Sequence, residues 1–130
     1  MLDKSSAAKL YQLYLQGERR FQNLDLEQEN LARASLSQIY LSGSKLDNVN
    51  LEQADLSHAS FIESSLIKAN LSRANLGGAN LSGADLYKAN LTGANIAGAS
   101  FIGANLHRTN LSLVRICHLT VSLRGKEIRR

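Results

Sequence analysis

The sequence predicts an all-β fold wound as a repetitive rod, and three observations predict it. Every fifth residue from Phe21 to Val121 is apolar, a period that fits neither an α-helix at 3.6 residues nor a strand at 2. Small residues and glycines recur at fixed phases of the same pentad. The 130-residue chain has no proline, so every backbone N–H is available for pairing between windings. One large inward side chain per pentad therefore builds the core of a wound structure.

Each pentad has a large centre, a small inward position two residues before it and a corner two residues after it. Most centres are leucine, and most small positions are alanine, as at Ala69 and Ala74. Glycine at a fixed phase marks a turn that needs a positive φ. The glycines at the corner phase are Gly43, Gly78, Gly83, Gly93, Gly98 and Gly103.

The pattern Ala-(Asn/Asp)-Leu-x-x stands as ANLSR, ANLGG, ANLSG, ADLYK, ANLTG and ANIAG over residues 69–98. It resembles the pentapeptide-repeat family, and the resemblance covers about residues 21–121. The resemblance implies a right-handed quadrilateral β-helix with four pentads in each coil of 20 residues and about five coils. The expected organisation is a helical cap over residues 1–20, the β-helix over 21–121 and a basic C-terminal tail over 122–130.

Folding the sequence at 20 residues gives regular columns. The three phenylalanines, Phe21, Phe61 and Phe101, share one column of centres. The residues before another column of centres are all asparagine, namely Asn30, Asn50, Asn70, Asn90 and Asn110. Because stacked amides can bond to one another, we expect this column to form a structural ladder from coil to coil.

The N-terminal segment predicts a helix that covers the open edge of the first coil. Residues 4–16 place apolar side chains at helical spacing, with Asp3 or Ser5 as the N-terminal cap and Gly17 closing the end. The first coil departs from the small-residue pattern at Leu24, Glu29 and Ile39. Glu29 is the worst misfit, so either the coil opens near it or its carboxylate reaches solvent.

The C-terminal pentads loosen, and large apolar residues return there without an obvious lid. We expect this end to form a dimer or partner contact. The alternative is that residues 122–130 fold back as their own lid. The residues of the expected contact are Leu113, Val114, Leu119 and Leu123.

Composition narrows the class of protein. The formal net charge is +4, with acidic residues concentrated early in the repeats and basic residues towards the C-terminus. Cys117 is the only cysteine, which excludes an intrachain disulfide. The sequence shows no secretory signal and no run of the roughly 18 apolar residues of a membrane span, so we expect a cytoplasmic protein without membrane contact.

The sequence lacks a catalytic or metal-binding set. His58 and His107 fall on different columns, and the pair Cys117 and His118 lacks the further ligands of a zinc site. No glycine-rich phosphate loop follows a strand and opens a helix. We therefore expect a protein that is not an enzyme, with no cofactor, metal or catalytic residue.

One surface feature is a candidate interaction surface. Lys68, Lys88 and Arg108 fall on one corner column in successive coils. Like charges stacked so closely are mildly destabilising. They either fan into water or face an acidic partner.

The function that these observations favour is a protein–protein interaction or scaffold module with an unidentified protein partner. The resemblance agrees, because many bacterial and cyanobacterial members have no assigned activity and some bind regulatory proteins. The alternative is a DNA mimic that modulates a type II topoisomerase, which the near-neutral repeat body and basic C-terminus disfavour. Direct nucleic-acid contact is also disfavoured, because no aromatic platform accompanies the basic tail RGKEIRR.

Overall fold

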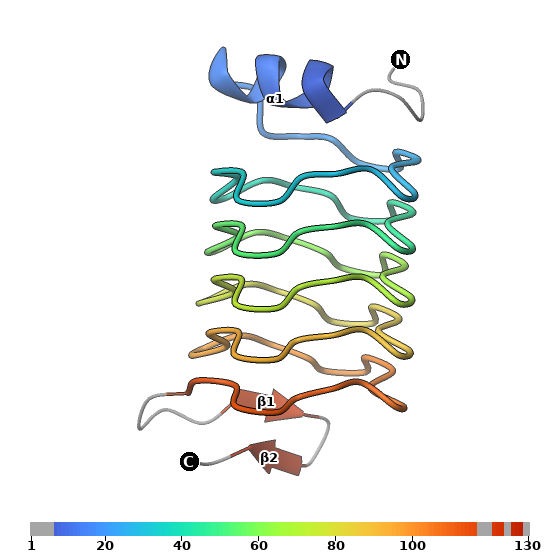
Figure 1. Cartoon of the computed structure of the whole chain (residues 1–130), viewed down its shortest axis with the longest axis vertical. Coiled ribbons are helices and arrows are strands. Elements are labelled where there is room, and N and C mark those ends of the chain that lie inside the picture. The colour runs from blue at the N-terminus through green and yellow to red at the C-terminus, as the bar shows by residue number, and fades with distance from the viewer. Residues whose placement is uncertain (1–6, 117–120, 124–125, 129–130) are drawn as a thin grey trace.

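The chain forms a stack of coils between a helix and a short strand pair (Figure 1). The computed structural model describes residues 7–116, together with the backbone of 121–123 and 126–128. Helix α1 spans Ala7–Leu15 and lies at one end of the stack. Strands β1 (Val121–Leu123) and β2 (Lys126–Ile128) lie at the other end and pair antiparallel.

Each coil takes 20 residues, as the sequence columns predict. Parallel bridges join residue i to residue i+20 throughout the stack, from Arg20↔Tyr40 to Asn95↔Arg115. The N–H of each centre from Phe21 to Ile96 donates to the coil that follows, as from Leu26 to the carbonyl of Lys45 at 2.8 Å. The all-β expectation needs one correction. Because a turn follows every centre, pairing is limited to single-residue bridges, and residues 7–116 contain no extended strand.

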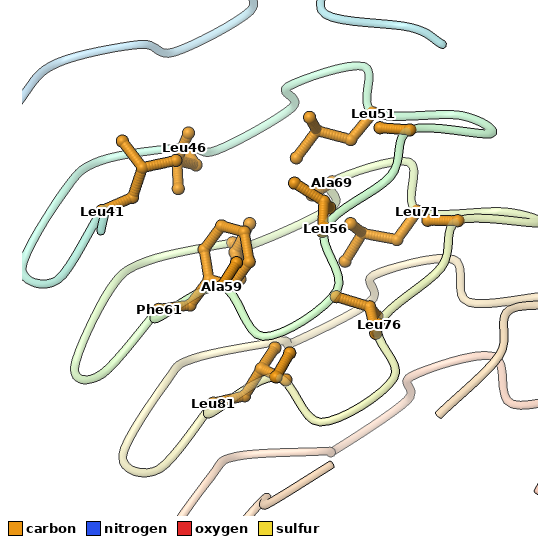
Figure 2. Close-up of a cluster of buried hydrophobic side chains, with 14 of the residues drawn as sticks. Leu41, Leu46, Leu51, Leu56, Ala59, Phe61, Ala69, Leu71, Leu76 and Leu81 are labelled. Atoms are coloured by element: carbon orange, nitrogen blue, oxygen red, sulfur yellow. The ribbon is translucent and has the colours of Figure 1, made fainter. Parts of the chain in front are cut away.

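The core consists of the two inward columns of each pentad. Figure 2 shows centres such as Leu46, Leu51 and Leu71 pointing into the coils with alanines between them. The centres from Leu36 to Ile96 are 0% exposed, and the alanines at the small positions from Ala54 to Ala99 are at most 3% exposed. Phe21, Phe61 and Phe101 are also buried, which fits their common column. The large and small columns together fill the interior.

The corners adopt the positive φ that the glycine phase predicts. Gly98 has a φ of +72°, and residues with side chains take nearly the same conformation. An L-residue in this conformation costs roughly 1–2 kcal/mol, so the winding imposes strain at each such corner. These corner residues are Asn23, Gln28, Arg33, Gln38, Asn48, Gln53, His58, Glu63, Lys68, Arg73, Lys88, Arg108 and Leu113.

The prediction that the asparagine amides of this column bond from coil to coil is wrong. In that column each side-chain oxygen accepts from the backbone N–H two residues later, as Asn70 does from Ser72 at 3.0 Å. The amide therefore closes its own corner as an Asx turn. A coil-to-coil amide bond occurs in another column, where Asn95 Nδ2 donates to Asn75 Oδ1 at 3.0 Å.

Helix α1 is the expected N-terminal cap. Leu10 is 0% exposed, and the Tyr14 hydroxyl donates to the backbone carbonyl of Ser37 in the first coil at 2.7 Å. Gly17 has a φ of +103°, and its N–H donates to the carbonyl of Tyr14 at 2.9 Å. The prediction that Gly17 closes the end of the helix is confirmed. The expected start at residue 4 and the caps Asp3 and Ser5 lie outside the described residues.

Glu29 does not open the first coil. Its backbone N–H donates to Leu26 at 3.2 Å and its carbonyl accepts from Asn50 at 3.0 Å, so the winding continues through it. The side chain is half-buried, and its Oε1 accepts from the N–H of Ala7 at 3.4 Å. A carboxylate at a helix N-terminus satisfies a free N–H and favours the helix dipole. The residue that breaks the repeat pattern therefore contacts the cap.

Within the described part of the chain, no helix combines the length and apolar character needed to cross a membrane.

Candidate interaction surface

The winding brings Lys68, Lys88 and Arg108 together on one exposed corner, as the sequence predicts. Each is the second residue of its turn, with the same φ of +59°. The N–H of Lys68 donates to the carbonyl of Tyr87 at 2.9 Å, and that of Lys88 to His107 at 3.2 Å. Consecutive coils lie about 4.8 Å apart, so three cations stand one above another. We call these three residues the basic corner.

Two ring side chains flank the basic corner. They were not predicted from the sequence. Tyr87 and His107 precede Lys88 and Arg108 in their turns, and their rings stack with centroids 5.7 Å apart and planes 8° from parallel. The Lys88 Nζ lies 5.4 Å from the centroid of the Tyr87 ring. The 20-residue spacing of Tyr87 and His107 is the sequence signal that could have identified this pair.

The same corner changes sign along the rod. Glu27 and Asp47 occupy the first turn position in the earlier coils, where the basic corner has Tyr87 and His107. Asp47 is engaged within the fold, because its carboxylate accepts from the N–H of Ile67 at 3.0 Å and from the Ser65 hydroxyl. The cationic section of the corner begins at Lys68.

Asp85 is the acidic residue nearest in sequence to Lys88, and its carboxylate is hydrogen-bonded to neighbouring residues of the rod. Asp85 Oδ1 accepts from the N–H of Tyr87 at 3.1 Å and from Asn105 Nδ2 at 3.0 Å. These bonds orient the carboxylate along the coils. They also fix the turn that carries Tyr87 and Lys88, so the local structure supports the basic corner.

The four residues of the expected C-terminal contact differ in their exposure, and the side chains of two of them lie outside the described part of the chain. Leu113 is 70% exposed, but Val114 is 2% exposed because it occupies a small inward position. Val114 is therefore part of the core and not a surface contact. Leu119 lies outside the described residues, and only the backbone of Leu123 is described, in β1.

Among the described residues, no three His, Cys, Asp or Glu side chains come together as metal ligands would. His58 and His107 lie on different corners, and His107 packs on Tyr87. Cys117 and His118 lie outside the described residues.

The family model for Pentapeptide repeats matches eight copies, over residues 20–53, 34–73 and 74–112. The chain belongs to the pentapeptide-repeat family. This membership fits the 20-residue windings and Asx-turn corners described above. No curated protein matches the sequence of this chain.

Solved pentapeptide repeat proteins share the fold. One from the Arabidopsis thaliana thylakoid lumen is 33% identical, with a TM-score of 0.68, covering 72% of this chain and 63% of that one. HetL from the cyanobacterium Nostoc, involved in heterocyst differentiation regulation, is 27% identical with a TM-score of 0.59, covering 92% and 51%. Rfr23 from the cyanobacterium Cyanothece 51142 is 28% identical with a TM-score of 0.56, covering 91% and 99%. The chain thus spans less than two thirds of the first two proteins.

Proposed function

We propose that this pentapeptide-repeat chain is a non-enzymatic interaction module that binds an acidic protein surface through the basic corner. Its scaffold is a right-handed quadrilateral β-helix of about five coils. The single observation that carries the proposal is the register of three exposed cations beside the stacked Tyr87–His107 pair.

The chemistry of the basic corner suits a protein partner. Tyrosine and arginine are enriched at the centres of protein interfaces, where rings supply contact area at a small entropic cost. Stacked like charges repel in the free protein. An acidic partner surface would relieve that repulsion and accelerate association by electrostatic steering. The rod supplies a rigid support, so the cations need little reordering on binding.

DNA mimicry of the topoisomerase-binding kind is the less favoured function. A mimic of DNA needs an extended negative surface, whereas this corner is positive from Lys68 to Arg108. The acidic residue Asp47 near the start of the corner is bonded to the chain itself.

The C-terminal end supports a second contact, which we propose as a dimer interface. Leu113 is 70% exposed, and the neighbouring centres Leu106 and Leu111 are only partly buried. Sedimentation velocity should show a concentration-dependent dimer that Leu113→Lys weakens. A monomer at all concentrations would contradict the dimer.

Affinity capture with charge-reversed variants tests the proposed function. The first variant changes Lys68, Lys88 and Arg108 to Glu. The control changes Arg33, Arg73 and Arg115, exposed residues on other columns, to Glu, so both variants have the same net charge. Mass spectrometry should find protein partners that the wild type and the control retain and the first variant loses. Equal recovery by both variants would remove the basic corner as the binding surface.

A further inference from the structure

A second basic site lies at the N-terminal end of the rod, away from the basic corner. A solvent-open hollow of about 510 Å³ is lined by five side chains, which we call the arginine hollow. Every one of them can donate a hydrogen bond, and none is a carboxylate. The lining residues are Arg19, Arg20, Gln38, Tyr40 and His58.

The winding assembles the hollow from residues that are 20 positions apart. Arg20 and Tyr40 form a parallel bridge pair, so their side chains leave the same face in consecutive coils. Gln38 and His58 are the matching corner residues of consecutive coils, with φ values of +62° and +58°. Tyr40 is 43% exposed, which is high for a tyrosine in this fold. The donors are thus held by bridges and corners, not by a long loop.

Arg19 is fixed in place before any ligand binds. Its guanidinium carbon lies 3.7 Å from the centroid of the Tyr14 ring. Its Nη1 donates to the backbone carbonyls of Tyr14 at 2.8 Å and Glu18 at 3.0 Å. Its other N–H groups, and the whole Arg20 guanidinium, have no protein acceptor among the described residues. Preorganised donors without partners reduce the entropic cost of binding an anion.

One carboxylate lies close to these arginines. Glu18 Oε1 accepts from the N–H of Arg19 at 2.9 Å and from the N–H of Arg20 at 3.1 Å. Glu18 does not line the hollow. Its charge opposes an incoming anion, and two guanidinium groups outweigh it.

We propose that the arginine hollow binds a phosphate group, either free or on a phosphorylated protein segment. A guanidinium donates two parallel hydrogen bonds to phosphate oxygens, and two arginines match its double negative charge. The Tyr40 hydroxyl, the Gln38 amide and the His58 imidazole supply donors for the remaining oxygens. A carboxylate has two oxygens and one charge and would leave several donors unused. This site goes beyond the proposed function and does not depend on it.

Nuclear magnetic resonance titration of the ¹⁵N-labelled full chain tests the proposal. The probes are inorganic phosphate, a peptide with one phosphoserine, and acetate at equal ionic strength. Phosphate should give saturable shifts at the amides of Arg19, Arg20 and Tyr40 in the millimolar range, and acetate should not. Tighter binding of the phosphopeptide would identify a phosphorylated protein segment as the source, and equal binding would identify free phosphate. Shifts no larger than those with acetate would overturn the proposal.

Two substitutions with opposite expected effects make the test specific. Arg20→Gln should weaken phosphate binding about tenfold, because one charge-assisted pair is lost. Glu18→Gln keeps an oxygen acceptor for the two backbone N–H groups and should tighten binding by removing the opposing charge. Arg73→Gln, on a distant corner, serves as the control and should bind as the wild type does.

Unchanged binding by Arg20→Gln, or equal losses in Arg20→Gln and Arg73→Gln, would overturn the site. The charge-reversed basic corner should leave phosphate binding intact, which separates this test from that of the proposed function.

Discussion

At the scale of single residues, an asparagine that precedes a centre holds the corner that follows that centre. Its side-chain oxygen accepts from the N–H two residues later, and the corner residue then takes a positive φ. Where serine replaces asparagine at Ser65, the carboxylate of Asp47 from the preceding coil accepts from the N–H of Ile67 instead. Asp47 therefore supplies at this corner the acceptor that an asparagine supplies at others.

Replacing Asn70 tests how much this bond stabilises the corner. Asn70→Ala removes the acceptor for the Ser72 N–H at 3.0 Å and the Ser72 hydroxyl at 2.7 Å, and should lower the free energy of unfolding by about 1–2 kcal/mol. Asn70→Asp keeps the acceptor and should lie close to the wild type. Urea unfolding measures both. Equal stability of Asn70→Ala and Asn70→Asp would show that the Asx turn contributes nothing.

The sequence predicted that the asparagine column is structural but not which bonds it makes. Periodicity places Asn70 beside Asn50 and Asn90. It says nothing about the rotation of the amide, which depends on the turn that follows. The Asn70 and Asn90 oxygens also accept from the hydroxyls of Ser72 and Thr92 in the turns that follow. Asn75 is followed by Gly77, which has no hydroxyl, and its oxygen accepts from the Asn95 amide of the next coil as well as from the Gly77 N–H.

At the scale of elements, α1 closes the open edge of the first coil through one buried face and two polar contacts. Leu10 and Tyr14 face the coil. The Tyr14 hydroxyl bonds to Ser37, and Glu29 reaches the start of the helix. An uncovered coil edge presents unpaired backbone groups and invites aggregation. The helix therefore protects the N-terminal end of the rod.

Removing one hydroxyl tests the docking of α1. Tyr14→Phe loses the 2.7 Å bond to the Ser37 carbonyl and should lower the free energy of unfolding by about 1 kcal/mol. Tyr11→Phe is the matched control, because Tyr11 stacks with Tyr14 at a centroid distance of 6.3 Å and its hydroxyl makes no bond to another described residue. Thermal and urea unfolding of the two variants would compare them. A control that loses as much stability as Tyr14→Phe would contradict the docking contact.

Helical spacing was enough to predict the cap, and Gly17 to predict its end. The contact of Glu29 could not be predicted, because it depends on where the helix comes to lie over the coil. A polar residue at an inward position indicates only that the repeat is interrupted there. Its partner Ala7 is 22 residues away and belongs to a different element.

At the scale of the whole molecule, the 20-residue winding aligns residues that are 20 positions apart in columns along the rod. The basic corner and the arginine hollow both arise because residues 20 apart become neighbours. The column of Lys68, Lys88 and Arg108 could be read from the sequence. The ring pair Tyr87–His107 could have been read in the same way, whereas the arginine hollow also needs the position of α1, since Tyr14 holds Arg19.

Whether the basic corner is one column can be tested directly. Paired cysteines in a Cys117→Ser background would measure this by disulfide formation under mild oxidation. Lys68→Cys with Lys88→Cys should cross-link, because a coil spacing of about 4.8 Å falls within the Cα separation of disulfides, about 4.4–6.8 Å. Lys68→Cys with Arg73→Cys places the thiols on different corners of one coil and should stay reduced. If the second pair cross-linked and the first did not, the 20-residue winding, and with it the basic corner, would be contradicted.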